Sequence, residues 1–317
     1  SLGWMERKYT PDADTTRYWH DRHGRIRFAQ TARQRTLPPP RYSYSRYDRL
    51  GRTVESGEVM FQPYLDLAEH VGDSAFPSLS QQPIVDQTLV FYSAASPRGD
   101  YLGDTQRPQR YLLNRVSYTL RSIFNETPDD DSVMTSYSYD PHGNVEWMSS
   151  YAWGLGENFI RYDYDLYSGN LKELIYNEGT AEEYRQRYSF NLDNQIEQVS
   201  TSRNGVIWDR DARYLYYAYG PLRRVEVGED SLQGIDYTYT IQGWLKGINH
   251  PALWYNRACD PGGDSTAMDR ASIPADAFGM LLQYYEGDFT RSGLFTMPTY
   301  TLTTRNLFNG NISGWST

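Results

Sequence analysis

The sequence predicts an all-β protein, a long antiparallel sheet built from repeated β-hairpins. A Tyr-x-Tyr motif followed by a turn recurs every 23 to 27 residues, and a second turn signal falls between successive copies. The chain has 29 Tyr against 11 Phe, and tyrosine favours strands. Leu, Ile, Val and Phe make up only about 19% of the 317 residues, too few for a deep apolar core. These features favour sheets that touch water on both faces.

Residues 1–56 contain the first repeats. Asp21 and Asp48 each begin an Asp-x-x-Gly turn, which ends at Gly24 or Gly51. A type I turn prefers Asp first, where the carboxylate accepts backbone N–H bonds, and Gly fourth, where φ can be positive. We expect residues 57–136, which are rich in proline, to form an insertion that rejoins the sheet near residues 111–123.

Residues 137–250 are predicted to hold consecutive repeats. The turn positions continue through Asp140, Gly143, Asp165, Gly169, Asn191, Asn194, Gly220 and Gly243. Residues two apart in a strand share a face, so the tyrosines of neighbouring hairpins should form an aromatic ladder. Its predicted members are Tyr137, Tyr139, Tyr162, Tyr164, Tyr188, Phe190, Tyr214, Tyr216, Tyr237 and Tyr239. We expect Arg161, Arg187 and Arg213 to lie over such rings. Residues 251–317 are predicted to be a loop plus degenerate repeats, which makes the chain one continuous repeat domain.

Composition and charge exclude several classes of protein. The net charge of −9 argues against nucleic acid as a partner. Cys259 is the only cysteine, so the chain forms no internal disulfide and no cysteine-based zinc site. No stretch approaches the roughly 18 apolar residues of a membrane-spanning helix, and the first residues lack the apolar core of a signal peptide. We expect no membrane span and no cofactor.

Two side-chain pairs suggest chemistry, but each has a structural interpretation that we prefer. His20 and His23 are candidates for a metal pair, yet no third ligand is spaced to join them. Asp140 and Asp165 are candidates for the paired acids of a glycosidase. Both occupy a turn slot that Asn191 fills in another repeat, which suits an acceptor of backbone hydrogen bonds and not a proton donor.

Three further groups give weaker signals. Cys259 with His250 is a candidate nucleophile and base, although the two are nine residues apart. The acidic run 129–131 with Glu126 lacks the alternating ligand pattern of a calcium loop. Four tryptophans are candidates for stacking on sugar rings, although packing between hairpins is the preferred interpretation: Trp147, Trp153, Trp208 and Trp244.

The repeated Tyr-x-Tyr-Asp-x-x-Gly-x-Leu/Val unit resembles the YD repeats of the RHS family. That family includes bacterial polymorphic toxins, toxin-complex subunits and teneurins, and the resemblance covers most of the chain. It implies a β-sheet strip that curls into a hollow shell, which in bacterial members encloses a C-terminal toxic domain. Residues 237–249 look like a form common in very large secreted bacterial members, which implies a secreted or cell-surface location. Residues 260–263, Asp-Pro-Gly-Gly, echo the family's autoprotease signature, but repeats resume after them, so no protease residues are assigned.

The sequence therefore leads us to expect a non-enzymatic segment of an RHS/YD-repeat shell that encloses a toxic or unfolded polypeptide. Its expected partners are the remaining YD repeats and flanking regions of the parent chain, and an enclosed C-terminal toxin. The alternative is an extracellular adhesion or carbohydrate-binding module whose aromatic strand faces bind a glycan. A glycosidase or cysteine hydrolase is a third, weaker hypothesis.

Overall fold

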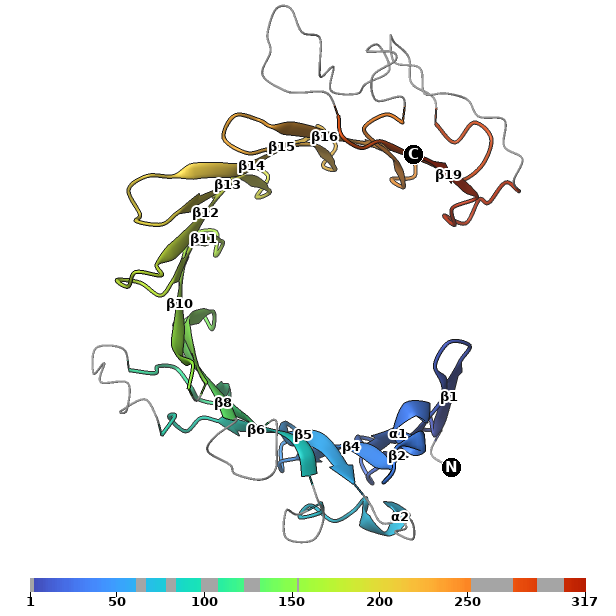
Figure 1. Cartoon of the computed structure of the whole chain (residues 1–317), viewed down its shortest axis with the longest axis vertical. Helices are drawn as coiled ribbons and strands as arrows, with labels where there is room; N and C mark the ends of the chain where they lie inside the picture. The colour runs from blue at the N-terminus through green and yellow to red at the C-terminus, as the bar shows by residue number, and fades with distance from the viewer. Residues whose placement is uncertain are drawn as a thin grey trace, which may run out of the picture. The chain divides into compact units, whose positions relative to one another are not determined.

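A computed structural model describes residues 3–60, 67–77, 84–97, 108–122, 132–152, 154–251, 276–289 and 305–317. The chain divides into two compact units, unit 1 (Ser1–Tyr162) and unit 2 (Asp163–Thr317). Within the described ranges there are nineteen strands and two short helices, so the predicted all-β class is confirmed (Figure 1). None of the helices in these ranges is long and apolar enough to cross a membrane.

The first ten strands and both helices begin in unit 1. They are β1 (Arg7–Thr10), β2 (Asp14–His20), β3 (Ile26–Gln30), α1 (Ala32–Thr36), β4 (Arg41–Tyr47), β5 (Thr53–Met60), α2 (Leu67–His70), β6 (Ile84–Tyr92), β7 (Val116–Ser122), β8 (Ser132–Tyr139), β9 (Val145–Ala152) and β10 (Gly156–Tyr164). Unit 2 holds β11 (Leu171–Tyr176), β12 (Tyr184–Phe190), β13 (Ile196–Ser202), β14 (Asp209–Tyr216), β15 (Leu222–Val227), β16 (Gln233–Tyr239), β17 (Leu245–Ile248), β18 (Met280–Gln283) and β19 (Gly314–Ser316).

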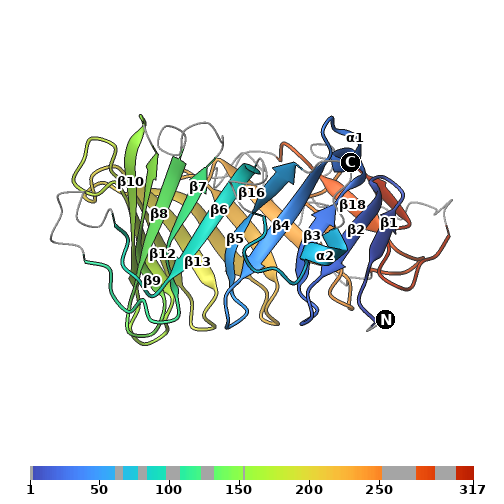
Figure 2. The same ribbon diagram turned by 90° about the horizontal axis from the view of Figure 1, so that it is seen from below.

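The strands form an antiparallel meander in each unit. In unit 1, β1 to β10 pair in chain order, each strand with the one before and the one after it. In unit 2, β11 to β19 do the same. The strands lie side by side, with hairpin turns at their ends (Figure 2). The predicted antiparallel hairpin repeat is therefore confirmed.

The sheet runs through part of the segment that we expected to leave it. Strand β6 lies inside residues 57–136, and it pairs with β5 on one side and β7 on the other. Its sequence, Ile-Val-Asp-Gln-Thr-Leu-Val-Phe-Tyr, is rich in β-branched and aromatic residues. The prolines around it drew our interpretation toward an insertion, although proline breaks strands only where it falls inside them.

Most strand residues are half-buried on both faces, as in β6, β10 and β12. One apolar cluster departs from this pattern, where Phe28, Val59 and Ile84 are fully buried. Leu67 and Phe76, from the segment around α2, pack against them. A second layer thus covers the sheet of unit 1 locally, whereas β10, β12 and β14 contain no buried residue and β16 alternates half-buried and buried residues.

The same bulge precedes most repeat turns. Register shifts fall at the last residue of β2, β4, β6, β8, β12, β14 and β16. A bulge adds one residue to a strand and increases its local twist. The repeats thus share backbone geometry as well as sequence.

Candidate functional site

The aspartates of the repeat turns are fully engaged by their own turns. In the first turn the Asp21 Oδ1 accepts hydrogen bonds from the backbone N–H of His23 (2.8 Å) and Arg25 (3.0 Å), and Oδ2 accepts one from Arg25 Nε (2.8 Å). Asp48 makes the same three bonds with Leu50 and Arg52. Each carboxylate therefore closes its own five-residue turn.

Asp140 and Asp165 follow the same arrangement. Asp140 Oδ1 accepts from the backbone N–H of Gly143 (2.7 Å) and Asn144 (2.9 Å), and Gly143 has a φ of +100°. Burial opposes ionisation of Asp140, but hydrogen bonds from Asn144 and Gly143 outweigh it and hold its pKa below the ordinary value. Backbone and hydroxyl hydrogen bonds from Ser168 likewise lower the pKa of Asp165. A glycosidase needs one carboxyl with a raised pKa, and neither residue provides it.

In other repeat turns a residue other than Asp occupies the first position and still accepts hydrogen bonds from the backbone of its turn. Asn191 replaces Asp and still accepts from two backbone amides, of Asp193 (3.0 Å) and Gln195 (2.9 Å). Thr240 accepts one, from Trp244 (3.1 Å). Positive φ at the fourth or fifth turn position is shared by Gly24, Gly51, Gly143, Gly169, Asn194, Gly220 and Gly243.

The tyrosine that precedes a turn bonds to the hairpin before it. In the described residues, five tyrosine hydroxyls donate to the carbonyl oxygen of the first residue of an earlier strand; we call these contacts tyrosine bridges. They are Tyr47 to Ile26 (2.9 Å), Tyr92 to Thr53 (2.9 Å), Tyr139 to Val116 (2.8 Å), Tyr216 to Ile196 (2.8 Å) and Tyr284 to Leu245 (2.7 Å). Each bridge ties one hairpin to its predecessor.

The residue just before the acceptor carbonyl covers the tyrosine ring in four of these bridges. The guanidinium of Arg25 lies 4.5 Å from the Tyr47 ring centroid, and that of Arg52 lies 4.1 Å from Tyr92. The other two pairs are Arg115 over Tyr139 (5.2 Å) and Trp244 against Tyr284 (5.1 Å). Two consecutive residues of the preceding hairpin therefore contact each of these tyrosines. The first packs against the ring, and the carbonyl of the second accepts a hydrogen bond from the hydroxyl.

The predicted arginine contacts are only partly met. Arg187 lies over an aromatic ring, that of Trp208, at 3.7 Å. Arg213 lies 3.9 Å from a carboxylate oxygen of Glu226. Tyr239 has its ring against Tyr217, at 6.3 Å. Sequence reasoning missed the ring-covering arginines beside the turns because the register between hairpins decides which arginine meets which ring.

The predicted tryptophans that the structure describes are used in packing. Trp147 is buried and its ring lies 5.7 Å from that of Phe159. Trp208 donates from Nε1 to the carbonyl of Gly205 (3.1 Å), beneath Arg187. Trp153, Glu126, the acidic run 129–131, Cys259 and residues 260–263 lie outside the described residues.

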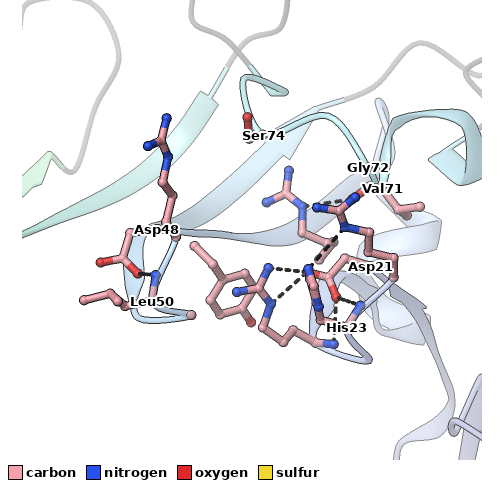
Figure 3. Close-up of a pocket in the computed structure, with 13 residues that line it drawn as sticks. Asp21, His23, Asp48, Leu50, Val71, Gly72 and Ser74 are labelled. Carbon is pink, nitrogen blue, oxygen red and sulfur yellow. Dashed lines mark hydrogen bonds and ion pairs between the residues drawn. The ribbon is translucent and has the colours of Figure 1, made fainter.

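A pocket of about 840 Å³ lies between the first two repeat turns and residues 71–74 (Figure 3). Four arginines line it: Arg22, Arg25, Arg27 and Arg49. Its two carboxylates, Asp21 and Asp48, already serve their turns. The lining therefore holds four guanidinium groups and two carboxylates.

Arg27 forms one wall of this pocket and is only 4% exposed. Its guanidinium donates to the backbone carbonyls of Ser45, Val71 (3.4 Å), Asp73 (2.9 Å) and Phe76 (2.6 Å). Burial, followed by the charge of Arg46, lowers its pKa from the ordinary value. Arg27 thus holds the segment after α2 against the sheet, and that segment completes the pocket.

The other arginines that line the pocket differ in their partners and exposure. Arg25 is paired with Asp21, at 2.6 Å. Arg22 donates to His23 Nε2 (3.2 Å), and Arg49 is exposed at the equivalent position of the next turn. His20 lies against the Trp4 ring, at 5.8 Å, so the two predicted histidines have separate partners. Among the described side chains, no group of three His, Cys, Asp or Glu residues lies close enough to hold a metal ion.

Sequence reasoning singled out none of these arginines. The one signal that pointed toward them was the excess of arginine over lysine, 28 to 3. Arginine's planar, permanently charged group suits both backbone carbonyls and aromatic faces.

Comparison with known proteins gives limited results. A scan of protein-family models and a search of curated proteins returned no match. Among solved structures, the chain is similar to TcdB2–TccC3–TEV (13% identity, TM-score 0.35, 88% of this chain) and to the Photorhabdus luminescens Tc holotoxin pore (14%, 0.36, 89%). It spans 15% of each of those chains. A porin-like protein from Bacteroides uniformis matches at 9% identity and TM-score 0.30, over 68% of this chain and 84% of that one.

Proposed function

We propose that this chain is a non-catalytic wall segment of a β-shell, which encloses a toxic or unfolded polypeptide of a larger secreted bacterial protein. The observation that carries the proposal is the exposure of both sheet faces. Strands β10, β12 and β14 hold only exposed and half-buried residues, with no buried residue on either face. An ordinary antiparallel sheet buries one face against a core. A thin wall between a lumen and the outside would instead keep both faces wet.

The tyrosine bridges support the proposal because they let such a wall persist without a core. An isolated hairpin is marginally stable in water. Here each hairpin gains a hydroxyl-to-carbonyl hydrogen bond and, in most cases, a covered aromatic ring from its predecessor. Hydrogen bonds contribute about 0.5–1.5 kcal/mol each, and cation–π contacts a similar amount. Stability of this kind grows with the number of repeats.

The engaged carboxylates support the non-catalytic part of the proposal. Asp21, Asp48, Asp140 and Asp165 are held ionised by their own turns, so their recurrence along the chain follows from folding. The mechanism of a shell is geometric: the wall denies the cargo access to solvent, substrates and proteases. The polypeptide cargo and the other repeats of the parent chain are the partners that this function requires.

A cryo-electron-microscopy reconstruction of the full-length parent protein tests the proposal. A closed β-wall with weakly ordered density inside it is the expected result. An open strip, or an interior filled by side chains, would contradict it. In that case a glycan array probed with the chain would test the adhesion alternative, in which exposed aromatic rings bind sugars.

A further inference from the structure

A second pocket of unit 1, of about 630 Å³, lies between the β1–β2 hairpin and α2. Its lining combines charged with aromatic residues. The charged residues are Glu6, Arg7 and Arg17, and Trp4 and Trp19 are among the aromatic ones. Pockets of roughly 300–1,000 Å³ with aromatic walls and a few polar groups are typical of small-molecule sites.

Arg7 and Arg17 are directly opposite each other in the antiparallel register of β1 and β2. The Cβ atoms of such partners are about 4.5–5.5 Å apart, and like charges at these positions destabilise the strand pair. Within the part of the chain that the structure describes, neither guanidinium forms an ion pair. Folding alone therefore gives no reason for this pair of arginines.

Arginines in other strands face an acidic residue. The paired positions are Arg46 with Glu55, Arg187 with Glu173, Arg213 with Glu226, and Arg224 with Asp236. In each of these pairs the two side chains also form an ion pair across the strands. The Arg7–Arg17 pair lacks this counter-charge, so both cations are available to an anionic group from outside the chain.

The two tryptophans of the pocket are held in place by their neighbours. The Trp4 indole lies against Gly24, where a Cβ would come within 2.9 Å of the ring, and 5.8 Å from the His20 ring. Trp4 is nevertheless 37% exposed. Trp19 is half-buried against the apolar cluster, with its ring 5.8 Å from that of Tyr42. Because both rings are fixed before a ligand arrives, binding costs little side-chain entropy.

Ala68 and Val71 complete the lining, and their segment is fixed as well. Val71 packs against the apolar cluster, and its carbonyl accepts a hydrogen bond from Arg27 (3.4 Å). The pocket is therefore formed in the absence of a ligand, as small-molecule sites usually are.

We propose that this pocket binds a sugar that carries a carboxylate, such as a uronic or sialic acid residue of a glycan. The planar guanidinium of arginine matches a carboxylate with two parallel hydrogen bonds, and two such groups stand side by side here. The exposed part of the Trp4 ring offers a flat apolar surface to the C–H face of the sugar ring.

Glu6 narrows the class of ligand. With two guanidiniums and one carboxylate, the charged lining residues carry only a small excess of positive charge. A phosphate group brings about two negative charges at pH 7, whereas a sugar carboxylate brings one. The hydroxyl groups of a sugar can also donate to the Glu6 carboxylate. The inference does not depend on whether the sheet encloses a cargo.

Isothermal titration calorimetry of the full chain at low salt tests the proposal with trigalacturonate, sialyllactose and lactose. At least one of the two acidic probes should bind with a dissociation constant of about 0.1–1 mM, and neutral lactose should not bind. The tighter of the two acidic probes identifies the kind of carboxylated sugar. Added salt should weaken the binding, because the arginines are exposed.

Arg17→Gln separates a binding role from a structural one. It should raise the dissociation constant at least about tenfold, through loss of a charged hydrogen-bond donor. It should also unfold at the same urea concentration as the parent or a higher one, because it removes a like-charge pair. Arg203→Gln, at an exposed arginine of unit 2, is the matched control and should bind like the parent.

Trp4→Ala should raise the dissociation constant about tenfold, and circular dichroism checks that this variant keeps its fold. Four results would overturn the proposal: neither acidic probe binds, lactose binds as tightly as they do, Arg17→Gln binds like the parent, or an equal concentration of sulfate displaces the sugar completely. The last result would mean that the arginines hold any anion and that the sugar ring contributes nothing.

Discussion

Replacing Asp21 with Ala removes the carboxylate that closes the first repeat turn. Three hydrogen bonds are lost, from the His23 amide, the Arg25 amide and the Arg25 side chain. A hydrogen bond to a charged group contributes about 1.5–3 kcal/mol. In the variant the two amides form some hydrogen bonds to water instead, and the three contributions are not additive. We therefore expect a loss of about 3 kcal/mol in the free energy of unfolding.

Asp21→Asn separates charge from hydrogen bonding at the same site. The amide oxygen can still accept the two backbone bonds, as Asn191 does in its own turn. The ion pair with Arg25, at 2.6 Å, is lost. We expect a cost of about 1 kcal/mol, smaller than that of the alanine variant. At Asp140 the fifth turn residue is Asn144 and not arginine, so Asp140→Asn should cost less than about 0.5 kcal/mol.

Urea unfolding followed by circular dichroism at pH 7 and again near pH 3 measures these differences. Burial raises the pKa of Asp21, but hydrogen bonds from Arg25 and His23 outweigh it and leave the pKa lowered. A lowered folded-state pKa stabilises the fold above the unfolded value of about 3.9, and this stability is lost as the pH falls through the folded pKa. The difference in the free energy of unfolding between the unsubstituted chain and Asp21→Ala should therefore be smaller at pH 3 than at pH 7.

Two outcomes would refute this reasoning. One is an alanine variant that unfolds at the same urea concentration as the parent at pH 7. The other is a gap that stays the same at both pH values, since that would mean the carboxylate contributes no charge-dependent stability.

Gly143→Val should cost roughly 1–3 kcal/mol, because valine would be forced to a φ of +100°; a thermal scan that overlays the parent's would contradict this. Gly57→Ala should cost about 3 kcal/mol in urea unfolding, because its new Cβ would lie 2.0 Å from the carbonyl oxygen of Asp86. Gly72→Ala, which meets nothing within 4 Å, is its control and should be neutral. Tyr216→Phe should cost about 1 kcal/mol at pH 7 through loss of its bridge. Burial raises the pKa of Tyr216, so this difference should close as the pH rises above about 10, which urea titrations at alkaline pH would reveal.

The antiparallel hairpin fold was predictable because its determinants are local. An Asp that accepts its own backbone amides, followed by a residue able to adopt positive φ, specifies a reversal within five residues. Alternation along the strands then fixes which residues share a face. The path of β6 was missed because proline composition was averaged over a long segment that contains a proline-free strand of nine residues.

The contacts that join hairpins were less accessible to sequence reasoning. Which arginine lies over Tyr47 depends on the register of two hairpins, and Arg25 is 22 residues away. The role of Arg27 is harder still to foresee, since all four of its hydrogen-bond acceptors are backbone carbonyls, which any sequence possesses.

The tyrosine bridges also determine how the sheet responds to force. Each bridge reaches only the hairpin before it, so no contact of this kind spreads a load over distant strands. When an end of the chain is pulled, strain falls on one hairpin while the rest remain folded, as in the opening of a zipper. A motor that threads polypeptides would therefore dismantle the bridged hairpins one at a time and never meet the full stability of the sheet at once.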